Sequence, residues 1–144
     1  MPKNRRSFLI TAAAFGVVFA SGVFTARAMQ DDSKKNRLFE MRIYHTNPGK
    51  LDALNARFRD HTTKLFEKHG MENVGYWVPQ GDDRKNQLIY ILAFPDRAAR
   101  DKSFKEFGAD PDWHKARDES EKPGKIVQKV ESIFLSPTDY SKMK

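Results

Sequence analysis

Seven consecutive apolar residues, from Leu88 to Phe94, restrict the fold of this chain more than any other segment. A polar turn at residues 80–86 precedes the run. Apolar stretches of this length, bounded by turn residues, are typical of buried strands. Because both faces of such a strand are apolar, both must be covered. We therefore expect this strand to lie centrally in a sheet.

Three other segments are predicted strands. Leu38–His45 alternates with a period of two, which separates its side chains into two faces: Phe39, Met41 and Ile43 on one, and Glu40, Arg42 and Tyr44 on the other. Residues 74–78, stopped by Pro79, and residues 126–135 are the remaining strands.

Two helical regions alternate with these strands. An apolar stripe recurs at helical spacing through Leu51, Leu54, Phe58, His61 or Thr62, and Leu65, which predicts an amphipathic helix over residues 50–69 that Gly70 ends. A second helix is predicted over residues 97–107, with Asp96 as its cap and Gly108 at its end. Helix then restarts at Asp110-Pro111 and runs to about residue 120.

The order of elements is therefore β-α-β-β-α-β, which predicts a ferredoxin-like α+β fold. In this fold an antiparallel four-stranded sheet carries its helices on one face. The other face would then carry Tyr, Trp, Leu, Phe and paired charges, a large apolar surface for a monomer. Two such sheets packed face to face would close a dimeric α/β barrel, so we expect a homodimer.

The first 28 residues have the features of a bacterial export signal. An uncharged run at residues 7–26 follows Arg5 and Arg6, and Ala26-Arg27-Ala28 fits a small-residue cleavage site. The paired arginines before Phe8-Leu9 are typical of twin-arginine export. We expect a periplasmic protein, or a membrane-anchored one if the signal is not cleaved, since about 20 apolar residues can span a bilayer.

The rest of the chain divides into a polar linker at residues 29–36, a domain at residues 37–137 and a polar tail at residues 138–144. The whole chain has a charge of +7, with 26 Lys and Arg against 19 Asp and Glu. Removal of residues 1–28 deletes four cations and no acid, which leaves 22 − 19 = +3. A small charge of mixed signs gives no indication of a nucleic-acid partner.

Several kinds of chemistry are excluded or unsupported by the sequence. The chain has no cysteine, which excludes thiolate metal sites, Cys nucleophiles and disulfides. Its four histidines show no metal-binding spacing, and no nucleotide-binding loop or hydrolase motif is present. We therefore expect neither a metal nor a cofactor.

Four polar residues are candidates for catalysis: Glu40, Arg42, Tyr44 and His61. Glu40 and Arg42 stand about 7 Å apart on one strand face, close enough to pair or to share a ligand. The alternative is an ion pair that fixes the strand register or the dimer. His61 lies on or beside the apolar stripe of its helix, where it could be a general base or a structural histidine bonded to a carbonyl.

Aromatic residues supply the candidates for a ligand pocket: Tyr76, Trp77, Tyr90 and Trp113, with His114 beside them. They could line a pocket for an apolar or aromatic molecule, or they could pack in the core and the dimer. Packing is the favoured role for Trp113, because this residue directly follows the predicted start of a helix at Asp110-Pro111. Tyr76 and Trp77 must point to opposite faces because they are adjacent on a strand.

An ordered set of segments resembles the NIPSNAP family: Phe39-Glu40-Met41-Arg42-Ile43-Tyr44 followed by Asn47-Pro48-Gly49-Lys50-Leu51, Lys68-His69-Gly70 with Gly75-Tyr76-Trp77, the apolar strand ending in Phe94, and Asp110-Pro111-Asp112-Trp113. The resemblance covers residues 37–137. It implies the ferredoxin-like fold of the dimeric α/β-barrel superfamily but no common reaction, because related barrels include monooxygenases, haem-handling enzymes and binding modules.

Three functions agree with this sequence. The first is an exported homodimer that binds a small apolar or aromatic molecule within or beside its barrel. The second is a cofactor-poor monooxygenase or isomerase that uses Glu40, Arg42, Tyr44 and His61. The third is a non-catalytic module that presents its dimer surface to a protein partner.

Overall fold

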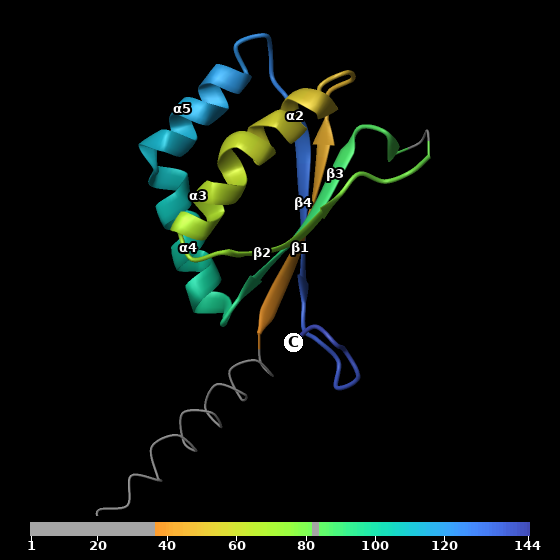
Figure 1. The fold of residues 1–144 in the computed structure, drawn as a ribbon, viewed down its shortest axis with the longest axis vertical. Coiled ribbons are helices and arrows are strands. Elements are labelled where there is room, and N and C mark those ends of the chain that lie inside the picture. Colours follow the sequence, from red (N-terminus) through yellow and green to blue (C-terminus); the bar gives the residue numbers. More distant parts are fainter. Residues whose placement is uncertain (1–36, 82–83) are drawn as a thin grey trace, which may run out of the picture.

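An antiparallel sheet forms one layer of the protein, and helices cover one of its faces (Figure 1). The computed structural model describes residues 37–81 and 84–144. The predicted signal at residues 1–28 and the linker at residues 29–36 lie outside this part. None of the helices in the described ranges is long and apolar enough to cross a membrane.

The four strands are those that the sequence predicts, with small shifts at their ends. They are β1 (Leu38–Thr46), β2 (Glu72–Trp77), β3 (Gln87–Phe94) and β4 (Val127–Leu135). The strand order is β2-β3-β1-β4, and every neighbouring pair is antiparallel. The apolar run therefore lies centrally, as predicted, because β3 has a neighbour on each side.

The register of β1 and β3 decides which side chains lie under the helices. Glu40 pairs with Leu92 and Arg42 with Tyr90. Since residues opposite each other share a face, the charged residues of β1 lie on the same side as the buried core of β3. The prediction that paired charges lie on the uncovered face is wrong: Glu40 is fully buried on the helix side.

The side of the sheet away from the helices is called the open face. It carries an apolar set from all four strands: Phe39, Met41, Ile43, Trp77, Ile89, Ile91, Ala93, Ile133 and Leu135. At one end it also carries His45, whose Nε2 lies 2.8 Å from Oε1 of Glu131. The open face is therefore mostly apolar, with Phe39, Met41 and Ile43 of β1 where the sequence led us to expect paired charges.

The first predicted helix contains a π-helical segment. It consists of α2 (Leu51–Arg57), the π-helix η1 (Phe58–Thr62) and α3 (Thr63–Lys68). The buried side chains follow one another at steps of four, as Leu54, Phe58, Thr62 and Phe66. In a regular α-helix each step of four overshoots one turn by about 40°, so the row would leave the core. The wider π turn returns these residues to one face.

The second helical region is divided as predicted into α4 (Arg97–Ala109) and α5 (Pro111–Ser120). Carboxylates cap both helices: Asp96 accepts from the backbone N–H of Ala99, and Asp110 accepts from that of Asp112, each at 2.8 Å. Gly108 lies within α4, one residue before its end, so the predicted boundary is slightly early. An extended backbone at Asp110 separates the two helices.

The core lies between the sheet and the helices. Its buried members come from every layer: Leu54, Phe58, Leu65, Phe66, Met71, Leu88, Tyr90, Leu92, Phe94, Phe107 and Ile126. Aromatic rings join the layers, since Phe66 lies 4.9 Å from Phe107 and 6.0 Å from Tyr90 between ring centroids. Apolar burial of this kind is the main stabilising contribution to the fold.

Asp110 links the end of α3 to the start of α5, which makes the helix layer sensitive to acid. Its carboxylate bonds Nζ of Lys68 at 2.9 Å and Nε2 of His69 at 2.7 Å. These bonds and the backbone N–H of Asp112 hold the pKa of Asp110 well below its usual range. The resulting stabilisation is complete above the unfolded pKa of about 3.9 and is lost as pH falls toward the folded value.

We expect Asp110→Asn to lower the free energy of unfolding at pH 7, because Asn retains the cap but not the charge. At pH 2.5 the difference from the wild type should be smaller. Urea denaturation at both pH values measures it. Asp112→Asn, at an exposed position in the same helical turn, is the matched control and should change little. Equal effects of Asp110→Asn at both pH values would contradict the prediction.

Candidate functional site

Glu40 is the most completely bonded side chain of the sheet. Its Oε1 accepts from Nη1 of Arg42 at 2.7 Å, from Nη2 of Arg100 at 2.8 Å and from the hydroxyl of Ser132 at 2.6 Å. Its Oε2 accepts from Nε of Arg100 at 2.7 Å. These four residues are called the Glu40 network. It joins β1, β4 and α4 through one carboxylate.

The electrostatics of the network keep Glu40 ionised. Burial alone would raise the pKa of Glu40, but the hydrogen bonds from Arg100, Ser132 and Arg42 outweigh burial and lower it. Burial acts against the charge of Arg42 in the same way, and nearby Tyr90, Tyr44 and Glu40 raise its pKa. With four hydrogen bonds to its carboxylate and a lowered pKa, Glu40 has the properties of a structural anion and not of a general base.

Three tyrosines lie beside this network in an aromatic cluster. Tyr90 stacks on Tyr76 with centroids 5.4 Å apart, and Tyr44 meets Tyr90 at the same distance. Phe58 of η1 packs 5.1 Å from Tyr90. Burial raises the pKa values of Tyr76 and Tyr90, so both phenols stay protonated at neutral pH.

Two buried polar atoms of this region have no hydrogen-bond partner among the described residues. They are Oη of Tyr90 and Nε of Arg42. The Arg42 guanidinium lies over the ring of Phe104 at 4.9 Å and over that of Tyr44 at 5.7 Å. Cation–π contact therefore offsets part of the missing hydrogen bonding of Arg42.

A hollow of about 230 Å³ opens at the outer edge of the aromatic cluster. Phe58, Tyr76 and Leu88 supply its apolar surface, and the polar residues around it are Asn55, Arg59 and Thr63. It is called the aromatic hollow. Its combination of ring faces with a few hydrogen-bonding groups is typical of sites for small ligands.

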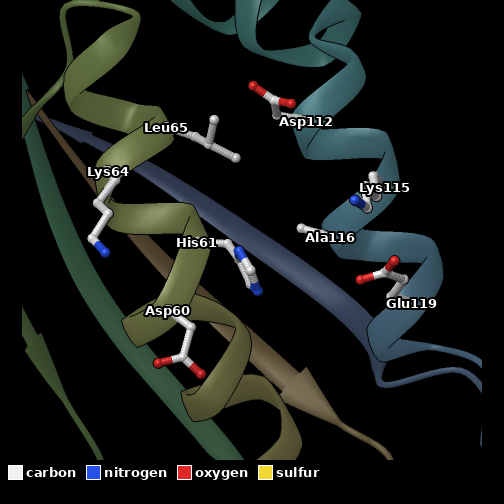
Figure 2. A pocket seen from close by; sticks show the side chains of 8 residues that line it. All are labelled: Asp60, His61, Lys64, Leu65, Asp112, Lys115, Ala116 and Glu119. Carbon is white, nitrogen blue, oxygen red and sulfur yellow. The ribbon is translucent and has the colours of Figure 1, made fainter.

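His61 does not reach the Glu40 network. Figure 2 shows its ring extending from η1 toward α5, into a groove between the two helices. The side chain is exposed, whereas its neighbour Thr62 is buried. The π turn explains this placement, because it brings Thr62 into the core row and leaves His61 outside it. The expectation that His61 shares a catalytic set with Glu40 is therefore not supported by the geometry.

The other predicted site residues are separated. Trp77 lies on the open face, half exposed, with its ring against Gly75. Trp113 packs on Phe107 with centroids 4.6 Å apart, the packing role expected for it. His114 has its Nε2 2.8 Å from the carbonyl oxygen of Gly108. Of the predicted pocket residues, Tyr76 lines the aromatic hollow and Tyr90 packs behind it, while Trp77, Trp113 and His114 lie elsewhere.

Sequence reasoning missed most residues of the aromatic hollow, and it also missed Arg100, Ser132 and Arg57. Arg100 and Ser132 are distant in sequence from Glu40, and their pairing depends on how α4 and β4 pack. Arg57 is buried, with its guanidinium 5.4 Å from the Trp113 ring. Arg57 could have been found from the sequence, because a cation beside the apolar stripe of a predicted helix is unusual. No group of residues in the described ranges is arranged to hold a metal ion.

The family of this chain follows from a comparison of its sequence. Residues 39–142 match the model of the NIPSNAP family. The chain belongs to the NIPSNAP family. Among curated proteins no sequence matches it. The NIPSNAP match includes β1 to β4 and most of the residues after β4.

Solved structures show the same fold. A NIPSNAP family protein of unknown function from Agrobacterium tumefaciens has 21% identity and a TM-score of 0.67, over 76% of this chain and 96% of that one. An uncharacterized NIPSNAP-like domain protein from Burkholderia xenovorans has 18% identity and a TM-score of 0.66, over 74% and 90%. A putative antibiotic biosynthesis monooxygenase from Bacteroides thetaiotaomicron has 20% identity and a TM-score of 0.51, over 77% and 99%. These similarities establish the ferredoxin-like α+β fold.

The Glu40 network predicts a large loss of stability when its anion is removed. Glu40→Gln leaves the buried guanidinium of Arg42 without a counter-charge and leaves Arg100 paired with Asp101 alone, so we expect the free energy of unfolding to fall by about 3–5 kcal/mol. Ser132→Ala removes one hydrogen bond and keeps the ion pairs, and should cost about 1 kcal/mol. Urea denaturation at pH 7 compares the two variants. Equal effects would show that the charge of Glu40 is not the important property.

Proposed function

We propose that this NIPSNAP protein is exported, forms a homodimer through the open faces of two sheets, and binds a small aromatic molecule in the aromatic hollow. The ligand proposal rests on the apolar surface that Phe58, Tyr76 and Leu88 form in the aromatic hollow. Export rests on the sequence of residues 1–28 alone.

The size of the aromatic hollow suits one ring with a short substituent. An apolar cavity of about 150 Å³ holds benzene, and this hollow measures about 230 Å³. Phe58 and Tyr76 meet at a centroid distance of 5.7 Å with their planes 67° apart. Two rings at such an angle offer a ligand one stacking contact and one edge contact. Asn55 and Arg59 could then bond a polar substituent.

The homodimer is supported by the composition of the open face. Trp77, Ile133 and Leu135 are exposed on it, with exposed fractions of 50%, 40% and 37%. A single chain rarely leaves a contiguous apolar surface of this kind in water. Two copies related by a two-fold axis would cover each other's apolar surface, which is the usual solution for self-complementary faces.

A monooxygenase or isomerase that uses Glu40, Arg42, Tyr44 and His61 together has less support. Glu40 already accepts four hydrogen bonds from Arg42, Arg100 and Ser132, and His61 lies on the outer side of the helix layer. A protein-interaction module without a ligand remains the second candidate, because the open face alone would serve it. Ligand binding in the aromatic hollow distinguishes the two.

We expect p-cresol to bind the aromatic hollow, and saturation-transfer NMR with the full chain measures this binding. Asn55→Phe places a ring in the hollow and should weaken binding at least about tenfold. Asp52→Phe adds the same ring to an exposed position of α2 and is the matched control. Binding that is absent in the wild type, or equal in the two variants, would overturn the ligand proposal.

We expect Ile133→Glu to dissociate the dimer, because it places a charge in an apolar interface. The dissociation constant should rise at least about 30-fold, which corresponds to roughly 2 kcal/mol. Val130→Glu is the matched control: Val130 is equally exposed, at 39%, on the opposite face of β4. Analytical ultracentrifugation of both variants across a concentration series provides the measurement. A monomeric wild type at micromolar concentration would refute the dimer.

A further inference from the structure

A hollow of about 300 Å³ lies at one corner of the open face. Its floor is formed by Phe39 of β1, Ile91 of β3 and Leu135 of β4, and residues 136–143 supply the remaining wall. These residues follow β4 at the end of the sheet where β1 begins (Figure 1). This region is called the tail hollow, and it lies on the other side of the sheet from the aromatic hollow.

The surface of the tail hollow is mostly apolar, with hydroxyl groups beside it. Pro137 and Met143 add apolar contact to that of the floor. The hydroxyls of Ser136 and Thr138 make no hydrogen bond within the described ranges, whereas that of Ser141 donates to the carbonyl oxygen of Met143 at 2.8 Å. The tail hollow is therefore matched to an apolar ring system that carries a hydrogen-bond donor.

The opposite corner of the open face carries such a ring. Trp77 ends β2 and is half exposed. Its ring lies across Gly75, where a Cβ would be only 2.6 Å from the nearest ring atom. Glycine at this position therefore lets the ring lie on the strand, where it forms a raised apolar step. The indole also has one N–H donor, which needs an acceptor when the ring is buried.

The register of the sheet sets the separation of the Trp77 ring and the tail hollow. Trp77 lies opposite Ile89, whereas Phe39 lies opposite Ala93, four residues farther along β3. The two positions are thus about 13 Å apart along the strands and about 10 Å apart across them. This distance is longer than a tryptophan side chain, so Trp77 cannot fill the hollow of its own chain.

A two-fold axis can bring the ring and the hollow together between two chains. In a dimer through the open faces, the axis lies between the sheets. If it passes over Ile91 and Met41, it places Trp77 of each chain on the tail hollow of the other, and the contact occurs twice. Because the offset runs diagonally across the sheet, the strands of the two sheets cross at a steep angle, as in orthogonal sheet packing.

We propose that Trp77 of each chain occupies the tail hollow of the other, an inference that rests on the proposed homodimer. A cavity of about 150 Å³ holds benzene, so a hollow of about 300 Å³ has room for the two fused rings of an indole. The indole N–H donates to the hydroxyl of Ser136 or Thr138. A tryptophan that fills a pocket of its partner is a typical hot spot of an interface.

Analytical ultracentrifugation measures the contribution of the ring to the dimer. Trp77→Ala should raise the dissociation constant about 100-fold, because each dimer loses the contact twice. Tyr140→Ala removes a ring that is 84% exposed and lies outside the tail hollow, and should have no effect. A monomeric wild type would overturn the proposed dimer and this contact with it. A dimeric wild type that Trp77→Ala leaves unchanged would overturn the contact alone.

A mixture of two variants shows whether Trp77 acts across the dimer. Met143→Ala alters the wall of the tail hollow. When one chain carries Trp77→Ala and the other Met143→Ala, both changes fall in the same contact and the second contact is intact. The mixed dimer should therefore exceed about half of all dimers, the largest random share, when native mass spectrometry counts the species. A random share would overturn the proposal, as would equal enrichment with Tyr140→Ala in place of Met143→Ala.

Discussion

The buried carboxylate of Glu40 is the interaction on which the rest of this structure depends. One anion holds two guanidinium groups and a hydroxyl, and so fixes α4, β1 and the edge strand β4 relative to each other. Replacement by an apolar residue could stabilise such a site only if both arginines changed with it. The network therefore specifies how α4 sits on the sheet, which in turn places the aromatic rings of α4 against β3 and α3.

The positions of the strands along the chain and the division of β1 into two faces could be predicted because period-two alternation is a local property. The apolar run at residues 88–94 could only be central, and Asp96 and Asp110 were identifiable caps. Which face of β1 is covered could not be predicted from alternation alone. Phe39 and Met41 have the apolar character of a core face, yet the helices cover the face of Glu40. The reason is that Arg100, which pairs with Glu40, comes from α4.

The candidate sites were harder to predict than the fold. Tyr76 and Trp77 were separated correctly by alternation, but the aromatic hollow also needs Phe58 and Leu88 from two other elements. The groove that His61 enters depends on α5 lying beside η1, a packing arrangement with no local signal. A regular period left the stripe position open between His61 and Thr62, and the structure buries Thr62 and leaves His61 exposed beside the stripe. The row of buried residues at steps of four was the available indication of a π turn.

The π segment also limits how the length of this helix can change. In η1 the extra residue per turn is what keeps Phe66 in the same row as Leu54. Deletion of one residue there would allow an unbroken α-helix in which Phe66 follows Leu54 by about eleven positions, close to three full turns, so Phe66 would stay in the core row. Deletion of a second residue would rotate everything after it by about 100° and take Phe66 out of the core. The π turn therefore lets this helix lose one residue, but not two, without loss of its packing.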